Sequence, residues 1–541
     1  MASTLPQRSP SISASESDEK TSQIVKSQDI SPGDVEAEVA SVAESDLPQG
    51  RQLGLTSVTF LMINRMVGTG VFATTSTILA QSGSVGMSLI YWVLGGIIAG
   101  AGYAVYAEFA TAIPRNGGEL NYLQHVYRKP KFLVGCMFGA QALLLGQAAG
   151  NAYTAGRYFL RAGGIIDNEW ASRGIGVAVL VSALLIHGSL LKWGLRFLNV
   201  MGVFKIVIML LISFAGFGAL AGRTKVEVPN NFANAFEGSR NDMFGIASCI
   251  YNAGWSYVGY SNAYYSMGEV RSPVRTIKIA GPLAIILITI LYLLVQIAYF
   301  AAVSREDILG STQIIAALFF QNMFGDSAAR ALSVFVALSA VANVFSVVFS
   351  QGRLNQALGR DGLVPFSKIL ASNRPFKAPL AGLTWHVIVT LIILLAPPAG
   401  DAYNFVLNLS SYPFNVVNAA VSFGLMVTYI PIKFRPEWAQ AWAPPFRASL
   451  PVTLFFILVS FFLVVVPWIP PNKPSEAVYV GGMFYAIAPA VSFGIFAAGG
   501  LYWLVRFWAL PKYGGYVLVP VRGELSDGTV VQSFEKHPKA E

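Results

Sequence analysis

Charge is scarce in this chain. Only 12% of its 541 residues are Asp, Glu, Lys or Arg, whereas 54% are hydrophobic. A soluble domain carries about 25% charged residues, so this chain has too little polar surface for a water-soluble globule of its size. The composition argues against a soluble enzyme and against a nucleic-acid binder, and it excludes disorder for most of the chain. It is typical of a helical protein that crosses the membrane several times.

Cysteine and histidine are also rare. The two cysteines, Cys136 and Cys249, lie in apolar runs, and the four histidines are far apart in the sequence. Neither set has the spacing of a disulfide framework or a metal site. No Ser–His pair, His-rich run or pair of carboxylates occurs in the apolar stretches, which argues against an intramembrane enzyme. We therefore predict no enzymatic activity, no metal site and no resident cofactor.

Long apolar stretches follow one another from residue 54 onward. We predict twelve membrane-spanning helices, because each stretch is long enough to cross a bilayer. Their approximate bounds are 54–80, 86–112, 132–160, 174–191, 196–221, 241–267, 277–303, 327–352, 380–397, 402–430, 449–468 and 482–508.

Both ends of the chain are polar. Residues 1–50 are rich in Ser, Asp and Glu, carry a net charge of −6 and are predicted to be a disordered tail, while residues 509–541 form a short C-terminal tail. An even number of spans places both tails on one side of the membrane. The loops that share this side hold 17 Lys and Arg residues, more than the loops on the other side, which predicts cytoplasmic termini. The net charge of +9 thus reflects membrane topology rather than binding to nucleic acid.

Small residues interrupt the first and the sixth predicted spans. Gly68 and Gly70 flank Thr69 in the first span, and the pair Ala253-Gly254 lies in the middle of the sixth. Glycine lowers helix stability and permits unwound backbone. The positions of the two interruptions are those of two inverted repeats, spans 1–5 and 6–10, each of which opens with a broken helix.

A broken helix offers a binding site that needs no charged side chain. Amides at the start of the second half-helix favour a carboxylate, because they have no partner within the helix and lie at the positive end of its dipole. The freed carbonyls accept an ammonium group. We therefore predict a site for an α-amino acid near the membrane midplane. The alternative is that the glycines only allow close helix packing, and the paired occurrence favours the site.

Three motifs resemble those of the amino acid–polyamine–organocation superfamily. Residues 67–72 (VGTGVF) are similar to its Gly-Ser-Gly-Ile-Phe element, and residues 107–119 (AEFATAIPRNGGE) to the end of its second span and the loop that follows. Arg353 with residues 359–365 (GRDGLVP) resembles the end of its eighth span. The order and spacing of the motifs carry the resemblance. The lead-in 64–66 (NRM) and the acidic, Ser-rich tail resemble the L-type-like branch, among the fungal high-affinity methionine permeases.

The resemblance implies an all-α integral membrane protein of the LeuT-like fold. Ten helices within residues 54–430 would form a five-plus-five inverted repeat with broken spans 1 and 6. Residues 449–508 would add two peripheral helices. These bounds leave residues 1–50 and 509–541 as cytoplasmic tails.

The resemblance also implies a place for each end of the substrate. The carboxylate would bind the amides near Gly68, Thr69, Gly70 and Val71. The amine would meet the carbonyls of Met66, Ile250 and Ala253. Thr69 and Val71 replace the usual Ser and Ile, which are mild departures.

The outer gate departs further from the family pattern. Ile250 stands where many L-type members have an aromatic gate, so the outer lid must be another residue. Trp255 and Tyr257 are the candidates, although Trp255 would serve equally as a packed aromatic.

Lys205 is a charged residue in the middle of the fifth predicted span. Charge at this depth is costly and indicates function. In sodium-coupled relatives of the fold a cation site lies between spans 1, 5 and 8, and the resemblance places Lys205 there. Its ammonium would contact carbonyls of span 1. Either it titrates, and is then the proton-coupling group, or it is a permanently charged structural pin.

Two further charged residues are candidates for an inner gate. Arg65 lies three residues before Gly68 and faces the same side as the break, where it would line the inner vestibule or bind the carboxylate directly. Glu108, late in span 2, would partner Arg65 or a basic residue of a loop. An interfacial position for Glu108, with no gating role, is an equal alternative.

The side-chain pocket is predicted from neutral polar residues. Gln147 and Asn151 are one helical turn apart in span 3, Asn343 lies in the middle of span 8, and Ser256 follows Trp255. None of them is ionisable, which favours a neutral substrate. Hydrogen bonds between helices are an equal alternative for Gln147 and Asn151.

These features predict a secondary transporter that imports a neutral amino acid, methionine above others, by proton symport with alternating access. One alternative is an exchanger, but the loop 161–173 lacks the cysteine that L-type relatives use to bind a heavy chain, so we expect a stand-alone protein. Another is a nutrient sensor, with Lys20 and Lys26 in a tail that ubiquitin-ligase adaptors would bind. We expect a multi-pass protein of the plasma membrane, with the vacuolar membrane as the alternative.

Overall fold

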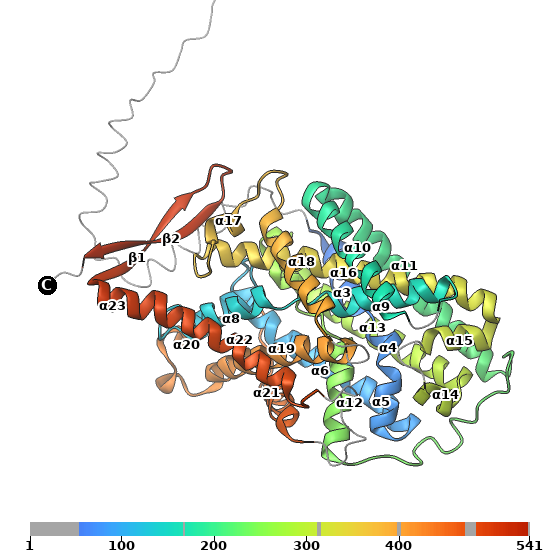
Figure 1. The fold of residues 1–541 in the computed structure, drawn as a ribbon. Coiled ribbons are helices and arrows are strands. Elements are labelled where there is room, and N and C mark those ends of the chain that lie inside the picture. Colours follow the sequence, from blue (N-terminus) through green and yellow to red (C-terminus); the bar gives the residue numbers. More distant parts are fainter. Residues whose placement is uncertain (1–52, 166–167, 311–314, 398–401, 471–482, 539–541) are drawn as a thin grey trace, which may run out of the picture. The chain divides into compact units, whose positions relative to one another are not determined.

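The fold of residues 53–165, 168–310, 315–397, 402–470 and 483–538 is described by a computed structural model, and it is mostly helical (Figure 1). The predicted tail at residues 1–50 lies outside the described residues. In the described part of the chain, nine helical segments are long and apolar enough to cross a membrane. They are Leu55–Ala73, Val85–Ala112, Leu133–Ala162, Glu169–Ser189, Leu191–Leu220, Pro273–Ala302, Asp326–Arg360, Leu450–Trp468 and Ile487–Gly514.

Three predicted spans correspond to helices outside that group. They are α12 (Met243–Ser256), α18 (Leu380–Leu395) and α19 (Ala402–Met426). Each of the twelve apolar stretches therefore contains helix, and the count of twelve crossings stays a prediction.

The remaining helices have the following bounds in chain order. In the first half they are α3 (Leu55–Met66), α4 (Gly70–Ala73), α5 (Thr75–Ser82), α6 (Val85–Ala112), α7 (Glu119–Val126), α8 (Leu133–Leu144), α9 (Ala149–Ala162), α10 (Glu169–Ser189) and α11 (Leu191–Leu220). In the second half they are η1 (Asn262–Glu269), α13 (Pro273–Ala302), α14 (Arg305–Gly310), α15 (Ile315–Phe324), α16 (Asp326–Arg360), α17 (Ser367–Ala371), η2 (Val427–Tyr429), η3 (Ile432–Phe434), α20 (Glu437–Gln440), α21 (Leu450–Val465), η4 (Val466–Trp468), α22 (Ile487–Trp503), η6 (Leu504–Ala509) and α23 (Leu510–Gly514).

Polar caps mark where several helices begin. Ser84 accepts a hydrogen bond from the Met87 amide at the start of α6, and Asp242 accepts one from the Gly245 amide at the start of α12. Such caps satisfy amides that have no partner within the helix. Asn168 plays the same part for α10, through the Ala171 amide.

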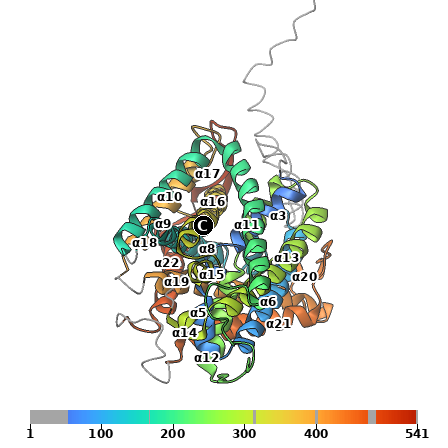
Figure 2. The same ribbon diagram turned by 90° about the vertical axis from the view of Figure 1, so that its right-hand side faces the viewer.

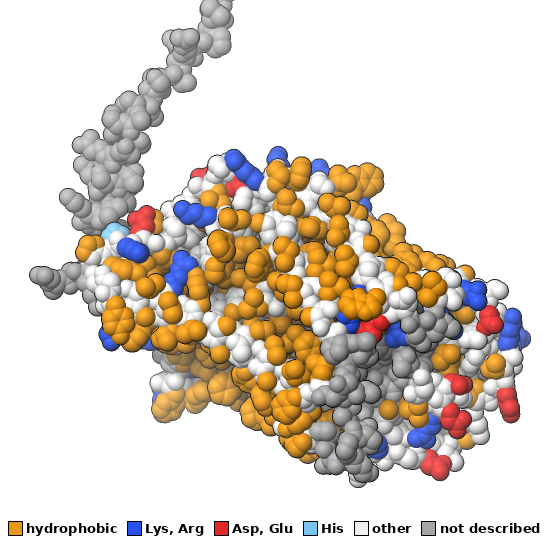
Figure 3. Space-filling view, in the orientation of Figure 1, with side chains coloured by type: hydrophobic (Ala, Val, Ile, Leu, Met, Phe, Trp, Pro, Cys, Tyr) orange, Lys and Arg blue, Asp and Glu red, His pale blue; other side chains and the backbone are white. Residues whose placement is uncertain are grey.

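The outer surface of the bundle is apolar, as a bilayer requires. Figure 3 shows hydrophobic side chains over the middle of one face, while Lys, Arg, Asp and Glu gather towards its ends. On α11, which runs beside α13 in Figure 2, Val203, Val207 and Phe214 are each at least half exposed. In water such a surface would be an aggregation hazard, whereas lipid tails cover it at no cost.

The connections between the long helices and the helix ends beside them form two groups, and the members of each group contact one another. In one group Arg353 pairs with Glu269 (3.2 Å) and the Leu53 amide donates to the Glu269 carbonyl. In the other group Arg305 donates to the Gly83 carbonyl and Lys225 to the Phe324 carbonyl.

The C-terminal tail contains a β-hairpin that the sequence analysis did not anticipate. Strands β1 (Tyr516–Glu524) and β2 (Val530–Pro538) pair antiparallel, with Tyr516 opposite Pro538. The Asp527 carboxylate at its turn accepts hydrogen bonds from the Ser372 hydroxyl (2.9 Å) and the Asn373 amide (2.6 Å). These bonds hold the hairpin against the segment between α17 and α18, and they lower the pKa of Asp527 to about 2.

We predict that Asp527→Ala releases the hairpin from this segment. Hydrogen bonds to a charged acceptor stabilise a local contact by about 1.5–3 kcal/mol, so trypsin should cleave within the hairpin about tenfold faster in the purified variant. Limited proteolysis followed by mass spectrometry measures this rate. Glu524→Ala removes an equal charge from an exposed position of the same hairpin and should cleave at the wild-type rate. Equal rates for Asp527→Ala and wild type would contradict the assigned docking contact.

Candidate functional site

The first break separates α3 from α4 at residues 67–69. Lys205, on α11 and only 1% exposed, donates hydrogen bonds to the Asn64 carbonyl (2.8 Å) and the Val67 carbonyl (2.5 Å). The prediction that this ammonium contacts span 1 carbonyls is confirmed. Because those carbonyls lie at the end of α3 and have lost helical partners, the ammonium replaces the missing donors.

Two asparagines bind the same unwound backbone from other helices. Asn151 on α9 accepts a hydrogen bond from the Thr69 amide (3.1 Å), and Asn343 on α16 donates to the carbonyls of Asn64 (3.0 Å) and Arg65 (2.5 Å). A Cβ atom at Gly68 would lie 2.7 Å from both asparagine side chains. Gly68 therefore permits this close approach, and the Thr69 amide is already bonded. The Gly70 and Val71 amides belong to the first turn of α4, where helical partners are missing.

Arg65 lies between the break and span 3. Its guanidinium donates to Asn343 Oδ1 (3.3 Å) and Gln147 Oε1 (3.4 Å), and 6% of the residue is exposed. Of the two partners predicted for Glu108, Arg65 or a basic residue of a loop, Arg65 is wrong. The Glu108 carboxylate instead accepts from the Trp442 indole (2.8 Å) and the Ala448 amide (2.8 Å), which tie α6 to the segment before α21.

Span 3 is also interrupted, by a turn that the sequence analysis did not predict. Helix α8 ends at Leu144 and α9 begins at Ala149, so Gln147 lies in the connecting turn. The prediction that Gln147 and Asn151 are one helical turn apart is therefore wrong, although both side chains contact residues of span 1. A Cβ at Gly146 would lie 2.6 Å from Thr390 Cα of α18, so the turn packs directly on backbone. The available signal was the Gly146-Gln147 pair inside an apolar run.

The second break follows α12, which ends at Ser256 and contains Ile250 and Ala253. The Tyr257 amide bonds to the Gly254 carbonyl, one residue nearer than in an α-helix, and so turns away from the Ala253 carbonyl. Gly259 then adopts a φ of +135°, which residues with a side chain rarely adopt.

The two breaks touch each other, and glycine stands at both contacts. A Cβ at Gly259 would lie 2.8 Å from the Met66 amide nitrogen, and one at Gly70 would lie 2.7 Å from Ser256 Cα. The Thr74 and Ser256 hydroxyls add a hydrogen bond of 3.2 Å. The structure thus brings together the segments that the sequence analysis predicted as one site.

Tyr292 of α13 also lies at this junction, and no sequence signal pointed to it. Its hydroxyl donates to the Met66 carbonyl (2.8 Å) and the Ser256 carbonyl (3.0 Å). One turn further on, the Gln296 amide donates to the Val71 carbonyl (3.4 Å). A tyrosine within an apolar span is ordinary in sequence, so only the tertiary contact reveals its position.

Cavities lie on both sides of α12. The large cavity, of about 320 Å³, lies between α5, α12, α19 and α22, and none of its described lining residues is charged. Ser76, Gln81, Ser248, Asn252 and Asn408 supply polar groups to it. A small cavity of about 20 Å³ is lined by residues that include Arg65, Gln147, Trp255 and Tyr265.

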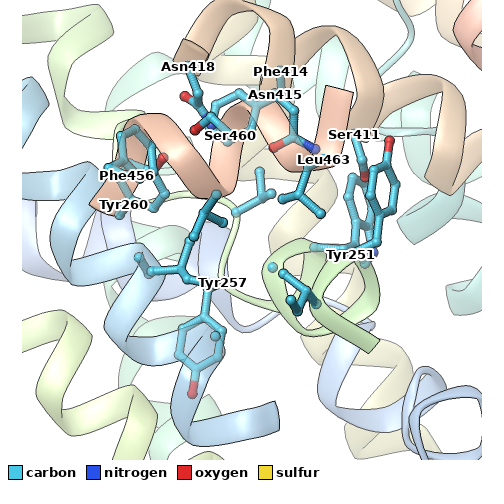
Figure 4. A pocket seen from close by; sticks show the side chains of 18 residues that line it. Tyr251, Tyr257, Tyr260, Ser411, Phe414, Asn415, Asn418, Phe456, Ser460 and Leu463 are labelled. Atoms are coloured by element: carbon cyan, nitrogen blue, oxygen red, sulfur yellow. The ribbon is translucent and has the colours of Figure 1, made fainter. Parts of the chain in front are cut away.

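Tyr251 and Trp255, one turn apart on α12, lie between these two cavities. Tyr251 lines the large one and donates a hydrogen bond to the Asn408 carbonyl (3.4 Å), whereas Trp255 lines the small one. Figure 4 shows a third cavity, of about 40 Å³, which Tyr257 and Tyr260 line together with residues of α19 and α21. The Tyr257 hydroxyl donates to the Trp92 carbonyl (3.1 Å), away from the large cavity. Of the two predicted gate candidates, Trp255 and Tyr257, only Trp255 lines the small cavity.

Comparison with known proteins places this arrangement in a family. The family described as "Amino acid permease" matches residues 53–496. The chain is 48% identical to the high-affinity methionine permease of Saccharomyces cerevisiae over 478 residues. This aligned stretch covers 88% of this chain and 82% of that protein. It is 29% identical over 514 residues to the low-affinity methionine permease of the same yeast (93% and 91%). It is 28% identical over 431 residues to the rat b(0,+)-type amino acid transporter 1 (77% and 82%).

The match over most of the chain agrees with the apolar helices and with the interrupted spans that meet at the centre. The protein is a multi-pass membrane protein and a transporter rather than an enzyme, and it belongs to the amino acid permease family.

Proposed function

We propose that the protein imports methionine across the plasma membrane by proton symport, with both termini in the cytoplasm. The observation that carries the proposal is the contact of the two broken helices, Gly70 against Ser256 and Gly259 against Met66. Helices interrupted in pairs bind zwitterions in transporters built from inverted repeats. The 48% identity to a high-affinity methionine permease supports methionine as the substrate. The chain would form twelve spans, ten of them in the five-plus-five repeat.

The backbone would bind both charged ends of the substrate. The carboxylate takes the Gly70 and Val71 amides, which lie in the first turn of α4 at the positive end of its dipole. The ammonium takes the Met66 and Ala253 carbonyls, one from each break, with Ile250 in the preceding turn of α12. At Met66 it replaces the Gly68 amide, which donates to that carbonyl at 2.8 Å. The thioether lies against Trp255. The large cavity, through which the substrate would approach, is lined by neutral residues, so an ionised side chain would be desolvated there without a partner.

Alternating access follows from the two ends of the site. The large cavity is the outer approach, and Tyr251 and Trp255 separate it from the small cavity. The inner end is closed by the Arg353–Glu269 pair and by the Tyr265 hydroxyl, which donates to the Glu119 carboxylate (3.2 Å). Transport requires that the outer helices close over the substrate before these inner contacts separate.

Lys205 is the proposed coupling group. It is fully enclosed and hydrogen-bonded to two carbonyls of the first break, so a change in its charge alters the backbone that binds the substrate. An ammonium that loses its proton keeps fewer donors for those carbonyls. Proton movement and the shape of the first break are thereby linked.

Replacement of Lys205 should uncouple uptake from the proton gradient. We predict that wild-type protein in proteoliposomes accumulates radiolabelled methionine when an inward proton gradient is imposed, and that Lys205→Ala does not. Lys192→Ala, at the start of the same helix, is the matched control and should behave as wild type. Wild-type uptake that needs internal amino acid and ignores the gradient would overturn symport and favour an exchanger.

A methyl group between the breaks should impair transport. In Gly70→Ala the new Cβ forces α4 away from Ser256, and overpacking of this kind costs about 1–3 kcal/mol, so we expect methionine uptake to fall by about tenfold. Gly254→Ala adds the same methyl group on α12, where no atom lies within 4 Å, and should retain uptake. Equal uptake by both variants would show that the contact between the breaks does not matter for transport.

The inner closure should weaken as pH rises. Burial raises the pKa of Glu119 to about 7, so the folded protein retains a proton that the unfolded chain releases near pH 4.5. Stability from this group is therefore lost as pH rises through 7. Asp361, with a pKa raised to about 6 by burial, acts in the same direction at lower pH.

We predict that the melting temperature of the purified protein falls between pH 6 and pH 8 and that Glu119→Gln reduces this fall. A thermal-shift series across pH measures it. Glu237→Gln, which changes an exposed acid, should retain the full fall. An unchanged pH slope in Glu119→Gln would refute the role of Glu119.

A further inference from the structure

Tyr292 is not part of the clamp, which is the set of backbone amides and carbonyls proposed to bind the carboxylate and the ammonium of the substrate. Its hydroxyl lies within hydrogen-bond distance of one carbonyl from each break, Met66 at 2.8 Å and Ser256 at 3.0 Å. A phenol has one hydrogen to donate and carbonyl oxygens only accept, so the two carbonyls share the same proton. One hydrogen atom therefore joins the end of α3 to the end of α12.

The ring of Tyr292 is fixed in place by its surroundings. The residue is fully buried, and its ring packs edge-on against Trp92 of α6 (centroids 5.5 Å apart) and against Tyr257 (5.1 Å). The Tyr257 hydroxyl in turn donates to the Trp92 carbonyl. The phenol thus has little freedom, and its oxygen is a fixed point for the backbone around it.

Helix α13 reaches the first break on both sides. Tyr292 binds the Met66 carbonyl before the break, and Gln296, one turn away, donates to the Val71 carbonyl after it. Two neighbouring positions of one helix therefore set the spacing between the last carbonyl of α3 and the first turn of α4. These are the two places where the proposed clamp needs a carbonyl for the amine and amides for the carboxylate.

We propose that Tyr292 is a positioning residue for the amine half of the clamp. By holding the Met66 and Ser256 carbonyls on one hydrogen atom, it sets the direction of the Met66 oxygen, whose other donor is the Gly68 amide (2.8 Å). The substrate ammonium would take the place of that amide. It also joins the two breaks, so that neither moves without the other while the site is formed. This inference rests on the proposed function, because it assigns a role within the same site.

The amine dependence of binding tests this role. The assay measures radiolabelled methionine bound to purified protein and its displacement by two unlabelled compounds, methionine and 4-(methylthio)butanoate, which lacks only the amine. In Tyr292→Phe the affinity for methionine should fall by about tenfold, the typical effect of removing a buried hydrogen-bond donor. The affinity for the deamino compound should change by less than about twofold, because its carboxylate and thioether contacts are unaffected.

Tyr299→Phe is the matched control. Tyr299 lies on the same helix, is fully buried and packs on Phe319, and its hydroxyl has no hydrogen-bond partner among the described residues. Both affinities should stay within about twofold of the wild-type values. If Tyr292→Phe does not purify as a folded protein, Tyr292→His keeps a ring with a donor, and its selectivity for the amine should fall by a smaller factor.

Three outcomes would count against the assignment. Equal weakening of both compounds in Tyr292→Phe would indicate a purely structural role for the hydroxyl. Unchanged amine selectivity in both Tyr292 variants would exclude any role in positioning. Failure of wild type and Tyr299→Phe to bind methionine would overturn the proposed function itself, and the assignment with it.

Discussion

A backbone group in the membrane interior must find a partner within the protein, and this constraint determines the centre of the structure. The unwound residues between α3 and α4 expose carbonyls and amides that lipid cannot satisfy. Lys205, Asn343 and Asn151 supply partners from three other helices, and Tyr292 supplies one from a fourth. Each break is therefore maintained by the helices around it, and the same side chains fix where its remaining groups point.

The partition between satisfied and available groups explains how one segment can be both stable and functional. The Thr69 amide is bonded to Asn151, whereas the Gly70 and Val71 amides begin a helix. At the second break, the Tyr257 amide has turned away from the Ala253 carbonyl. In the proposed site, amides of one break and carbonyls of both would bind the two charged ends of an amino acid. Selectivity for α-amino acids then needs no ionised side chain in contact with the substrate.

The sequence predicted the features that depend on unusual residues at fixed places. A lysine in the middle of an apolar span is costly, which marked Lys205 as functional, and the resemblance to the superfamily implied its contact with the span 1 carbonyls. Glycines inside apolar spans marked the breaks, because glycine permits unwound backbone. Tyr292, the turn at Gly146 and the partners of Glu108 could not be found in this way, because ordinary residues acquire their roles from neighbours distant in sequence. The C-terminal hairpin was missed because a short polar tail gives no periodic apolar signal.

The two ends of the proposed site differ in the chemical groups that hold them closed. At one end Tyr251 bonds to a backbone carbonyl beside a neutral cavity, so its contacts barely depend on pH. At the other end the closure involves an ion pair and a buried carboxylate whose pKa lies near neutrality. Ionisation of Glu119 leaves a charge in a buried position, which favours rearrangement of the η1 segment that carries Tyr265. The end that contains ionisable groups is therefore the one whose stability depends on pH.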